Sequence, residues 1–246
     1  MEWLGLTLAA WAVAMVIVLT GSILQGAMGF GLGLVAAPVL VLLDPTLVPG
    51  VVIGMGLPLA LIVAWRERRA VDVREIRWAV LGRIPGSIIG SWAVVALGTR
   101  ALAVGFSLSI LTAVGLSLGG LRVTRTPVTV TIAGFASGVT GTATSVGGPP
   151  MALLYQHDTG PALRSALAAF FATGALMSLT VLTIVGEFHG RELAVAVSLM
   201  PASLIGLALS GRLNRFLDGG HTRAAVLVVA VAAALTIGVR AALGAG

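Results

Sequence analysis

A short stretch within a long apolar region has the composition of a broken helix. Five of the nine residues from Ser137 to Ser145 are Ser or Thr, glycines interrupt them, and Pro149 and Pro150 follow. Gly and Pro are the residues that a helix interior tolerates least. Irregular backbone at bilayer depth is tolerated only where it is buried in protein or lines a cavity. The stretch therefore predicts a site near the middle of a membrane.

The composition of the whole chain predicts an all-α integral membrane protein. Of its 246 residues, 58% are hydrophobic and 10% are charged, and the mean hydropathy is +1.07; no soluble domain could cover so much apolar surface. The fifteen basic residues are all Arg. Loop arginines set the orientation of a membrane protein, so we expect no nucleic-acid binding. The absence of Cys and the scattered positions of the three His predict no metal site and no other cofactor.

A second Gly-rich stretch, from Gln25 to Pro38, repeats part of the first. At an offset of 112 residues, its Gly-x-x-Gly and the Pro nine residues further on coincide with those of the later stretch. Two more matches follow in order at offsets of 117 and 116: Arg74-Glu75-Ile76 with Arg191-Glu192-Leu193, and Pro85–Gly90 with Pro201–Gly206. These matches predict two homologous halves. Corresponding Gly/Pro-interrupted segments in two halves are a pointer to a transporter binding site.

Eight hydrophobic segments follow one another, and no connection between them is long enough for a soluble domain. Two segments are interrupted, 4–43 at its Gly-rich stretch and about 128–155 at the stretch described first. The other six are long enough to span a bilayer once each; they cover about 47–65, 78–97, 101–121, 162–185, 191–210 and 222–243. We expect one membrane domain over residues 1–246, with a first repeat at about 4–121 and a second at about 128–243.

The positions of the arginines indicate whether the interrupted segments cross the membrane or return as hairpins. If both cross, the arginines divide ten to five between the two sides; if both are re-entrant hairpins, they divide twelve to three. The positive-inside rule favours the second arrangement. Each half then has one hairpin and three transmembrane helices, an odd number, so we expect inverted repeats whose hairpins meet at the midplane.

The helix starts that follow the two breaks are candidate anion sites. Such starts present free backbone N–H groups and a partial positive charge, which bind anions without a charged side chain. The alternative is that the small residues only pack helices together, as they often do in membranes. The double Pro and the duplication favour a binding site. The candidate substrate-binding residues are Gln25, Gly26, Gly29, Phe30, Gly31, Ser137, Gly138, Thr140, Gly141, Thr142, Thr144, Ser145, Gly147, Gly148 and Pro149.

Few charged side chains lie within the predicted spans. Arg83 lies just inside one of them, and we expect it to snorkel to the membrane surface rather than to bind a ligand. Asp44 and Asp158 follow the two interrupted segments at equivalent positions, where we expect them to cap or turn the chain. A Ser–His pair for intramembrane catalysis would need His157, at a predicted membrane edge, to reach a deep serine. We therefore expect no catalytic residues and no enzymatic activity.

The Gln-Gly-x-x-Gly-Phe-Gly run at 25–31 and the Gly-Gly-Pro-Pro run at 147–150 resemble the two repeat signatures of the sulfite exporter TauE/SafE family of membrane permeases. The resemblance covers nearly the whole chain and implies a transporter of small anions, many of them sulfur-containing. The second stretch has Ala143 and Ser145 where the first has Gly31 and Gly33, so the two half-sites are not equivalent. The matching positions are Gln25, Gly26, Gly29, Phe30 and Gly31 in the first signature, and Gly138, Gly141, Gly147, Gly148, Pro149 and Pro150 in the second.

We expect a multi-pass secondary transporter of the inner membrane, and an exporter rather than an importer. The resemblance implies sulfite or an organosulfonate such as sulfoacetate as the substrate, moved by alternating access around the two breaks. The chain has no Gly-x4-Gly-Lys-Ser/Thr motif, so gradients would supply the energy. Two alternatives stay open, a proton-coupled or channel-like permease for a carboxylate and a membrane assembly subunit without transport. The expected partners are the anion and the lipid bilayer, and the sequence leaves homo-oligomerisation open.

Overall fold

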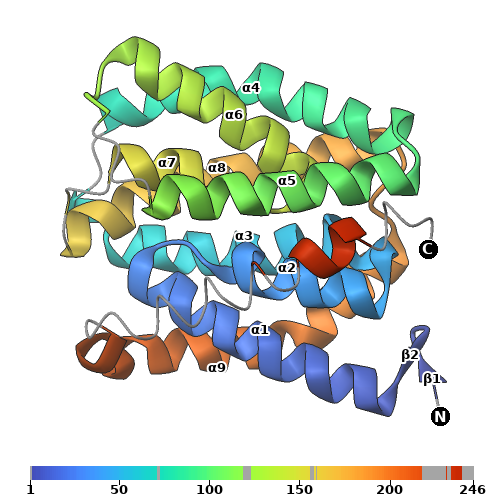
Figure 1. Cartoon of the computed structure of the whole chain (residues 1–246). Helices are drawn as coiled ribbons and strands as arrows, with labels where there is room; N and C mark the ends of the chain where they lie inside the picture. Colours follow the sequence, from blue (N-terminus) through green and yellow to red (C-terminus); the bar gives the residue numbers. More distant parts are fainter. Residues whose placement is uncertain are drawn as a thin grey trace.

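The structure, a computed structural model, describes residues 2–70, 73–118, 123–155, 158, 160–217, 231 and 234–239. Its helices run roughly parallel between two end faces (Figure 1). They are α1 (Leu8–Met28), α2 (Leu32–Leu43), α3 (Gly50–Arg66), α4 (Val73–Ala96), α5 (Thr99–Leu118), α6 (Pro127–Thr144), α7 (Gly148–Leu154), α8 (Gly160–Ile184) and α9 (Gly190–Leu217). The smaller elements are two 3-10 turns (Pro45–Leu47 and Arg68–Ala70) and two paired strands, β1 (Glu2–Trp3) and β2 (Leu6–Thr7).

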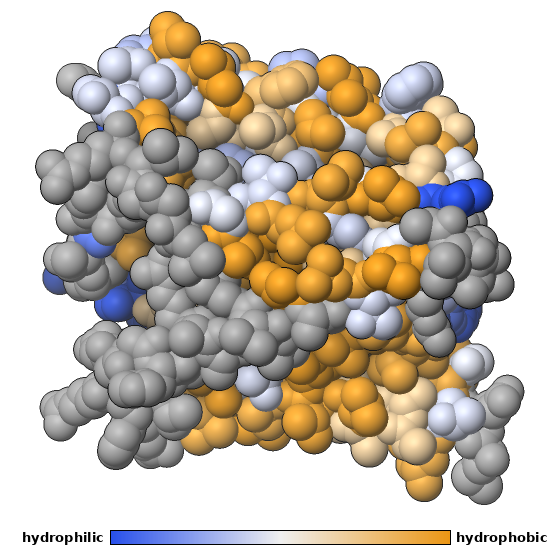
Figure 2. Space-filling model, viewed as in Figure 1, coloured by the Kyte–Doolittle hydropathy of each residue, from blue (hydrophilic) through white to orange (hydrophobic). Residues whose placement is uncertain are grey.

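Five of the described helices, α1, α3, α4, α8 and α9, are long and apolar enough to cross a membrane. The last four lie where the sequence predicts spans, and α5 lies at a fifth predicted span. On the face shown in Figure 2, hydrophobic residues form a belt between polar ends, as a bilayer requires. The predicted all-α, multi-pass membrane fold is confirmed. Most of the last predicted span, 222–243, lies outside the described residues.

Helices α1 and α2 form the first hairpin. Helix α1 ends where Gly29 adopts a left-handed conformation (φ +84°) and donates its N–H to the carbonyl of Gln25. The chain then reverses, so that Leu32 at the start of α2 packs on Gly21 of α1. The turn comes at the end of a 21-residue helix rather than at its middle. The sequence predicts a re-entrant hairpin here, whereas the first arm is long enough to cross the membrane alone.

Helices α6 and α7 form the second hairpin. Helix α6 begins with a capping box, in which the side chains of Thr126 and Thr129 each bond the other's backbone N–H. It ends at Ser145, which has a left-handed conformation (φ +63°). Helix α7 then begins with Pro149 and Pro150 in its first turn, where a missing N–H costs least. In both hairpins a long first arm is followed by a short return arm, of 12 residues in α2 and 7 in α7.

Polar contacts bring the two ends of the first hairpin to one face of the protein. Arg191, at the start of α9, donates to the Leu4 carbonyl before α1 (3.2 Å) and to the Asp44 carboxylate after α2 (2.6 Å). Burial alone would raise the pKa of Asp44, but hydrogen bonds from Arg191 and Thr46 outweigh it and lower that pKa. The carboxylate therefore stays ionised and holds the hairpin ends to α9.

The second hairpin has both ends at the opposite face. Arg125 before α6 pairs with Asp158 after α7 through two hydrogen bonds of 2.7 and 2.8 Å. At the same face Glu67, which follows α3, pairs with Arg164 near the start of α8 (3.2 Å). Both interrupted segments thus return to the face at which they enter, which is the arrangement that the arginine count favours.

Each hairpin packs along a helix from the other half of the sequence. Helix α6 lies along α4 and helix α1 along α9, at opposite edges of the molecule, with α3 and α8 between the two pairs (Figure 1). Gly82, Gly86 and Gly90 lie one turn apart on α4 and face carbonyl oxygens of α6. In the other pair, Gly206 of α9 faces the carbonyl of Leu19 on α1. Small residues of this kind let two membrane helices approach closely.

Replacing Gly86 by valine should disrupt the α4–α6 pair. A Cβ atom at Gly86 would overlap the carbonyl oxygen of Phe135 and lie 3.1 Å from the Cα of Gly138, so backbone would have to move. Overpacking of this kind costs about 1–3 kcal/mol or more. We expect Gly86→Val to lower the unfolding midpoint of the purified protein by about 2–12 °C. Gly105→Val is the control, since a Cβ atom there meets nothing within 4 Å; equal midpoints for the two variants would contradict the close packing.

Candidate anion-binding site

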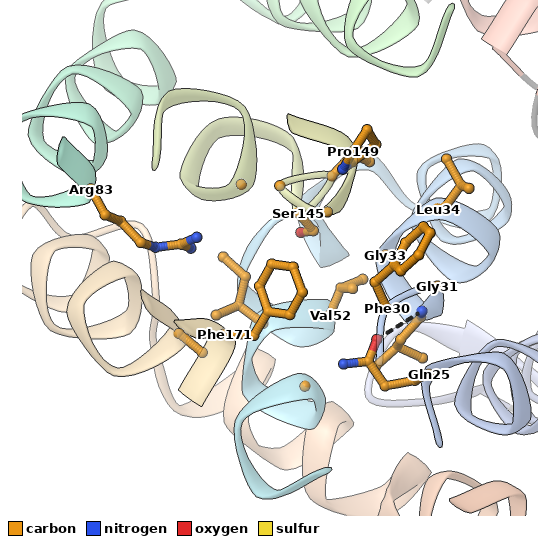
Figure 3. Close-up of a pocket in the computed structure, with 18 residues that line it drawn as sticks. Gln25, Phe30, Gly31, Gly33, Leu34, Val52, Arg83, Ser145, Pro149 and Phe171 are labelled. Carbon is orange, nitrogen blue, oxygen red and sulfur yellow. Dashed lines mark hydrogen bonds between the residues drawn. The ribbon is translucent and has the colours of Figure 1, made fainter. Parts of the chain in front are cut away.

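The tips of the two hairpins meet and border a cavity. A Cβ atom at Gly33 would overlap the carbonyl oxygen of Ser145, and one at Gly148 would lie 3.0 Å from the ring of Phe30. The cavity has a volume of about 80 Å³, which is room for several water molecules or one small ion. Figure 3 shows its lining. The lining residues are Gln25, Phe30, Gly31, Leu32, Gly33, Leu34, Val52, Ile53, Gly56, Arg83, Gly141, Ser145, Val146, Gly147, Gly148, Pro149, Phe171 and Ala175.

The first hairpin presents the start of α2 to the cavity. Gly31 precedes this helix with a φ of +139°, which other residues rarely adopt. The amide oxygen of Gln25 accepts a hydrogen bond from the Leu32 N–H (3.3 Å), and its amide nitrogen points toward the cavity (Figure 3). Gly33 and Leu34 belong to the first turn, whose N–H groups have no acceptor within the helix. The cavity therefore borders the partial positive end of a 12-residue helix.

The second hairpin offers fewer backbone donors than the first. Helix α7 has only seven residues, and Pro149 and Pro150 in its first turn have no N–H. Ser145 uses its hydroxyl to donate to the carbonyl of Pro49 (3.1 Å). Gly147 and Gly148 bring bare backbone to the cavity. The two hairpin tips thus contribute different chemistry, in agreement with the non-equivalent half-sites that the sequence predicts.

The positive charge in the cavity comes from Arg83 of α4. Its side chain is 4% exposed and reaches into the cavity (Figure 3). Nη1 donates to the hydroxyl of Ser137 (3.1 Å), whereas Nε has no hydrogen-bond partner. None of the described carboxylates pairs with this guanidinium. The prediction that Arg83 snorkels to the membrane surface is wrong, because α4 packs this part of its surface against α6 and α8.

A slot of small and aromatic residues holds the guanidinium of Arg83. Its carbon lies 4.8 Å from the ring centre of Phe170 on α8, a cation–π contact. A Cβ atom at Gly174, one turn further along α8, would overlap the guanidinium and lie 2.7 Å from Cδ. A Cβ atom at Gly141 would lie 3.2 Å from Nη2. Ser137, which accepts from Arg83, also donates to the carbonyl group at the α6–α7 turn. The position of the cation is therefore tied to the second hairpin.

Eight of the fifteen predicted substrate-binding residues line the cavity. They share a position at one of the two hairpin tips, and they are Gln25, Phe30, Gly31, Gly141, Ser145, Gly147, Gly148 and Pro149.

The other seven predicted residues lie beside the cavity and contact protein. Gly26 and Gly29 pack on α9 and α8, and Gly138 packs on α4. Ser137 holds Arg83, as described above. The three threonines form hydrogen bonds within the protein: Thr140 to the Ala136 carbonyl, Thr142 with Ser178, and Thr144 to the Thr140 carbonyl.

Arg83, Phe171 and the aliphatic part of the lining are not among the binding residues that the sequence predicts. Two signals pointed to Arg83. An ionisable residue within an apolar span is by itself a reason to suspect a functional site. Arg83 also lies three residues before Gly86, so it shares the side of α4 that carries the glycines.

The residues of the second half that correspond to Gln25 and Arg83 do not line the cavity. At the offset of 112, Gln25 corresponds to Ser137, and at the offset of 116, Arg83 corresponds to Leu199. Leu199 is fully buried and apolar. Of this pair, only Arg83, in the first half of the sequence, carries a charge.

Together these features define a multi-pass membrane protein in which the tips of two helical hairpins border a small cavity with a buried cation. The chain matches the family model described as sulfite exporter TauE/SafE over residues 13–237, nearly its whole length. It belongs to this family, which implies a membrane transporter of sulfite or related sulfur anions and is consistent with an inner-membrane location. No curated protein and no solved structure matches the chain.

Proposed function

We propose that the protein is a secondary transporter that exports a small sulfur oxyanion, either sulfite or an organosulfonate, through the cavity between the hairpin tips. The observation that carries the proposal is Arg83, a buried cation that no described carboxylate neutralises. A buried charge without a partner costs roughly several kcal/mol. Ionisable groups within membrane segments are kept where function needs them. A bound anion would supply the missing counter-charge.

The arrangement of donors supports an oxyanion with several oxygens. Arg83 reaches the cavity from one side, and Gln25 with the start of α2 lies on the other (Figure 3). A sulfite or sulfonate group carries three oxygens around one sulfur and can accept from both sides at once. A carboxylate has two oxygens in one plane, which suit a single donor pair. The sulfur oxyanion is therefore favoured over the carboxylate alternative.

The proposed transport mechanism is alternating access between two bodies. One body consists of α4 with the second hairpin, and the other of α9 with the first hairpin; the substrate cavity lies where the hairpin tips touch. We propose that the halves are inverted repeats and that the bodies rock about α3 and α8, which lie between them. Many secondary transporters place their substrate between such repeats.

We propose no catalytic role for the protein. The hydroxyl groups of Ser137 and Ser145 both donate to backbone carbonyls. In each serine the hydroxyl proton is thus donated to a carbonyl, whereas a nucleophilic serine would donate it to a base. His157, the predicted partner in the catalytic alternative, lies outside the described residues.

Thermal stabilisation by anions tests the proposal. A ligand that binds only the folded state stabilises it by about 2.7 kcal/mol at a hundred times its dissociation constant. We expect sulfite or an organosulfonate to raise the unfolding midpoint of the purified protein and Gln25→Ala to reduce that rise. Thr20→Ala, an exposed position on the same helix, is the control. A panel in which acetate and lactate stabilise the protein as much as the sulfur anions would contradict the assignment.

The direction of transport has a separate test. A membrane potential that is negative inside drives out an anion by about 2.3 kcal/mol per charge and 100 mV. We expect vesicles containing the protein to lose sulfite when a potential is imposed, with no pH gradient present. Flux that persists with the potential collapsed and a pH gradient kept would instead indicate proton coupling.

A further inference from the structure

The cavity contains one formal charge. Among its described lining residues, Arg83 is the one ionised side chain, and the other polar ones, Gln25 and Ser145, are neutral. Arg83 is at the same time 4% exposed, so bulk water does little to screen it. Most of the remaining lining consists of glycine, aliphatic and aromatic residues. The cavity is therefore a low-dielectric site with a charge of +1.

The charge that such a site accepts follows from electrostatics. Moving an ion out of water has a cost that rises with the square of its charge, and the attraction of the guanidinium rises only in proportion to it. A singly charged anion and Arg83 together are neutral. A doubly charged anion leaves one negative charge uncompensated beside the apolar walls, where no second cation is described. The helix start of α2 adds only about half a charge.

We propose that the cavity selects singly charged oxyanions, such as hydrogensulfite and simple alkylsulfonates, over doubly charged ones, such as sulfate and the fully ionised sulfite ion. This inference rests on the proposed function and narrows its substrate class. It separates the two substrates considered above, because sulfoacetate carries a sulfonate and a carboxylate and so has two charges at neutral pH. Phe171 and Val52, which line the cavity, would contact the uncharged substituent of the anion.

A matched pair of anions tests charge selection directly. Methanesulfonate and sulfate have nearly the same shape, because a methyl group replaces one oxygen, but they differ by one charge. At pH 7 and constant ionic strength, we expect the purified full-length protein to bind methanesulfonate at least about tenfold more tightly than sulfate. Equal affinity, or tighter binding of sulfate, would overturn the charge selection and leave anion transport standing. If no sulfur anion binds, hydrogensulfite included, the proposed function itself falls.

The pH dependence of sulfite binding gives a second readout. Sulfite takes up a proton near neutral pH, whereas methanesulfonate does not. We expect the apparent affinity for sulfite to weaken several-fold between pH 6 and pH 8 and the affinity for methanesulfonate to stay constant. The described residues against the guanidinium, Ser137, Gly141, Phe170 and Gly174, do not titrate in this range. Sulfite affinity that is constant or rises with pH would overturn the inference.

Adding a second cation should shift the preference. Gln25→Lys places a positive charge on the opposite side of the cavity from Arg83. We expect the preference for methanesulfonate over sulfate to fall by about tenfold in this variant. Arg77→Gln, which removes an exposed charge six residues before Arg83 on α4, should leave the preference unchanged. An unchanged ratio in Gln25→Lys would show that the number of charges does not set selectivity; if that variant does not fold, the wild-type comparisons decide.

Discussion

Replacing Arg83 by glutamine should strongly weaken anion binding without weakening the fold. The guanidinium is the one charged group described in the cavity lining, and a charge-assisted hydrogen bond is worth about 1.5–3 kcal/mol. We therefore expect Arg83→Gln to weaken the binding of sulfite or methanesulfonate by about 10- to 100-fold. In the absence of anions its unfolding midpoint should equal or exceed that of the wild type, because a buried charge that no described carboxylate neutralises is removed. Both quantities come from one thermal titration.

The two readouts separate a ligand-binding arginine from a structural one. If Arg83 only stabilised the α4–α6–α8 contact, Arg83→Gln would lower the midpoint in anion-free buffer. Arg77→Gln on the same helix serves as the control, since that side chain is exposed. Arg83→Lys keeps the charge but not the planar fork of donors, so we expect an affinity between those of the wild type and Arg83→Gln. A destabilised Arg83→Gln that still binds anions would contradict the assignment.

The sequence predicted the membrane fold and the two breaks because both depend on local composition. Apolar length fixed the spans, and the glycines and prolines near Gly29 and Pro149 marked the points where the chain turns. The distribution of arginines favoured hairpins, and the contacts of Asp44 and Asp158 place both ends of each hairpin at one face. These features need no knowledge of how distant helices pack.

The composition of the cavity depends on packing and was predicted only in part. Whether Arg83 snorkels or is buried depends on which helices cover that side of α4, and the answer comes from α6 and α8. Gly33 in the first hairpin contacts Ser145 in the second, and these residues are far apart in the sequence. Local composition does not show which residues of the two hairpins touch. The sequence predicts non-equivalent half-sites, and Pro149 and the short length of α7 leave few backbone donors in the second half. The proposed site therefore combines the start of α2 with Arg83, and the sequence predicts the first of these but not the second.

Replacing Gly174 by alanine should weaken anion binding as Arg83→Gln does, although the positive charge of Arg83 is kept. A Cβ atom at this position would overlap the guanidinium of Arg83, which is the far end of a long side chain, so we expect the arginine to move rather than the helix. Alanine is also favoured over glycine in a helix by about 1 kcal/mol, so α8 should not be weakened. We expect Gly174→Ala to lower anion affinity about tenfold or more, as displacement of a charge-assisted contact implies.

A double variant shows whether Gly174 acts through Arg83. If the only effect of the added methyl group is to displace the guanidinium, Gly174→Ala should change little in a protein that already carries Arg83→Gln. The two losses are then far from additive, as expected for groups in contact. Gly105→Ala on α5, where a Cβ atom meets nothing within 4 Å, controls for the general effect of alanine in a membrane helix. If the two losses of anion affinity are additive, Gly174→Ala affects the cavity without displacing Arg83. The slot at Gly174 would then not be what positions the guanidinium.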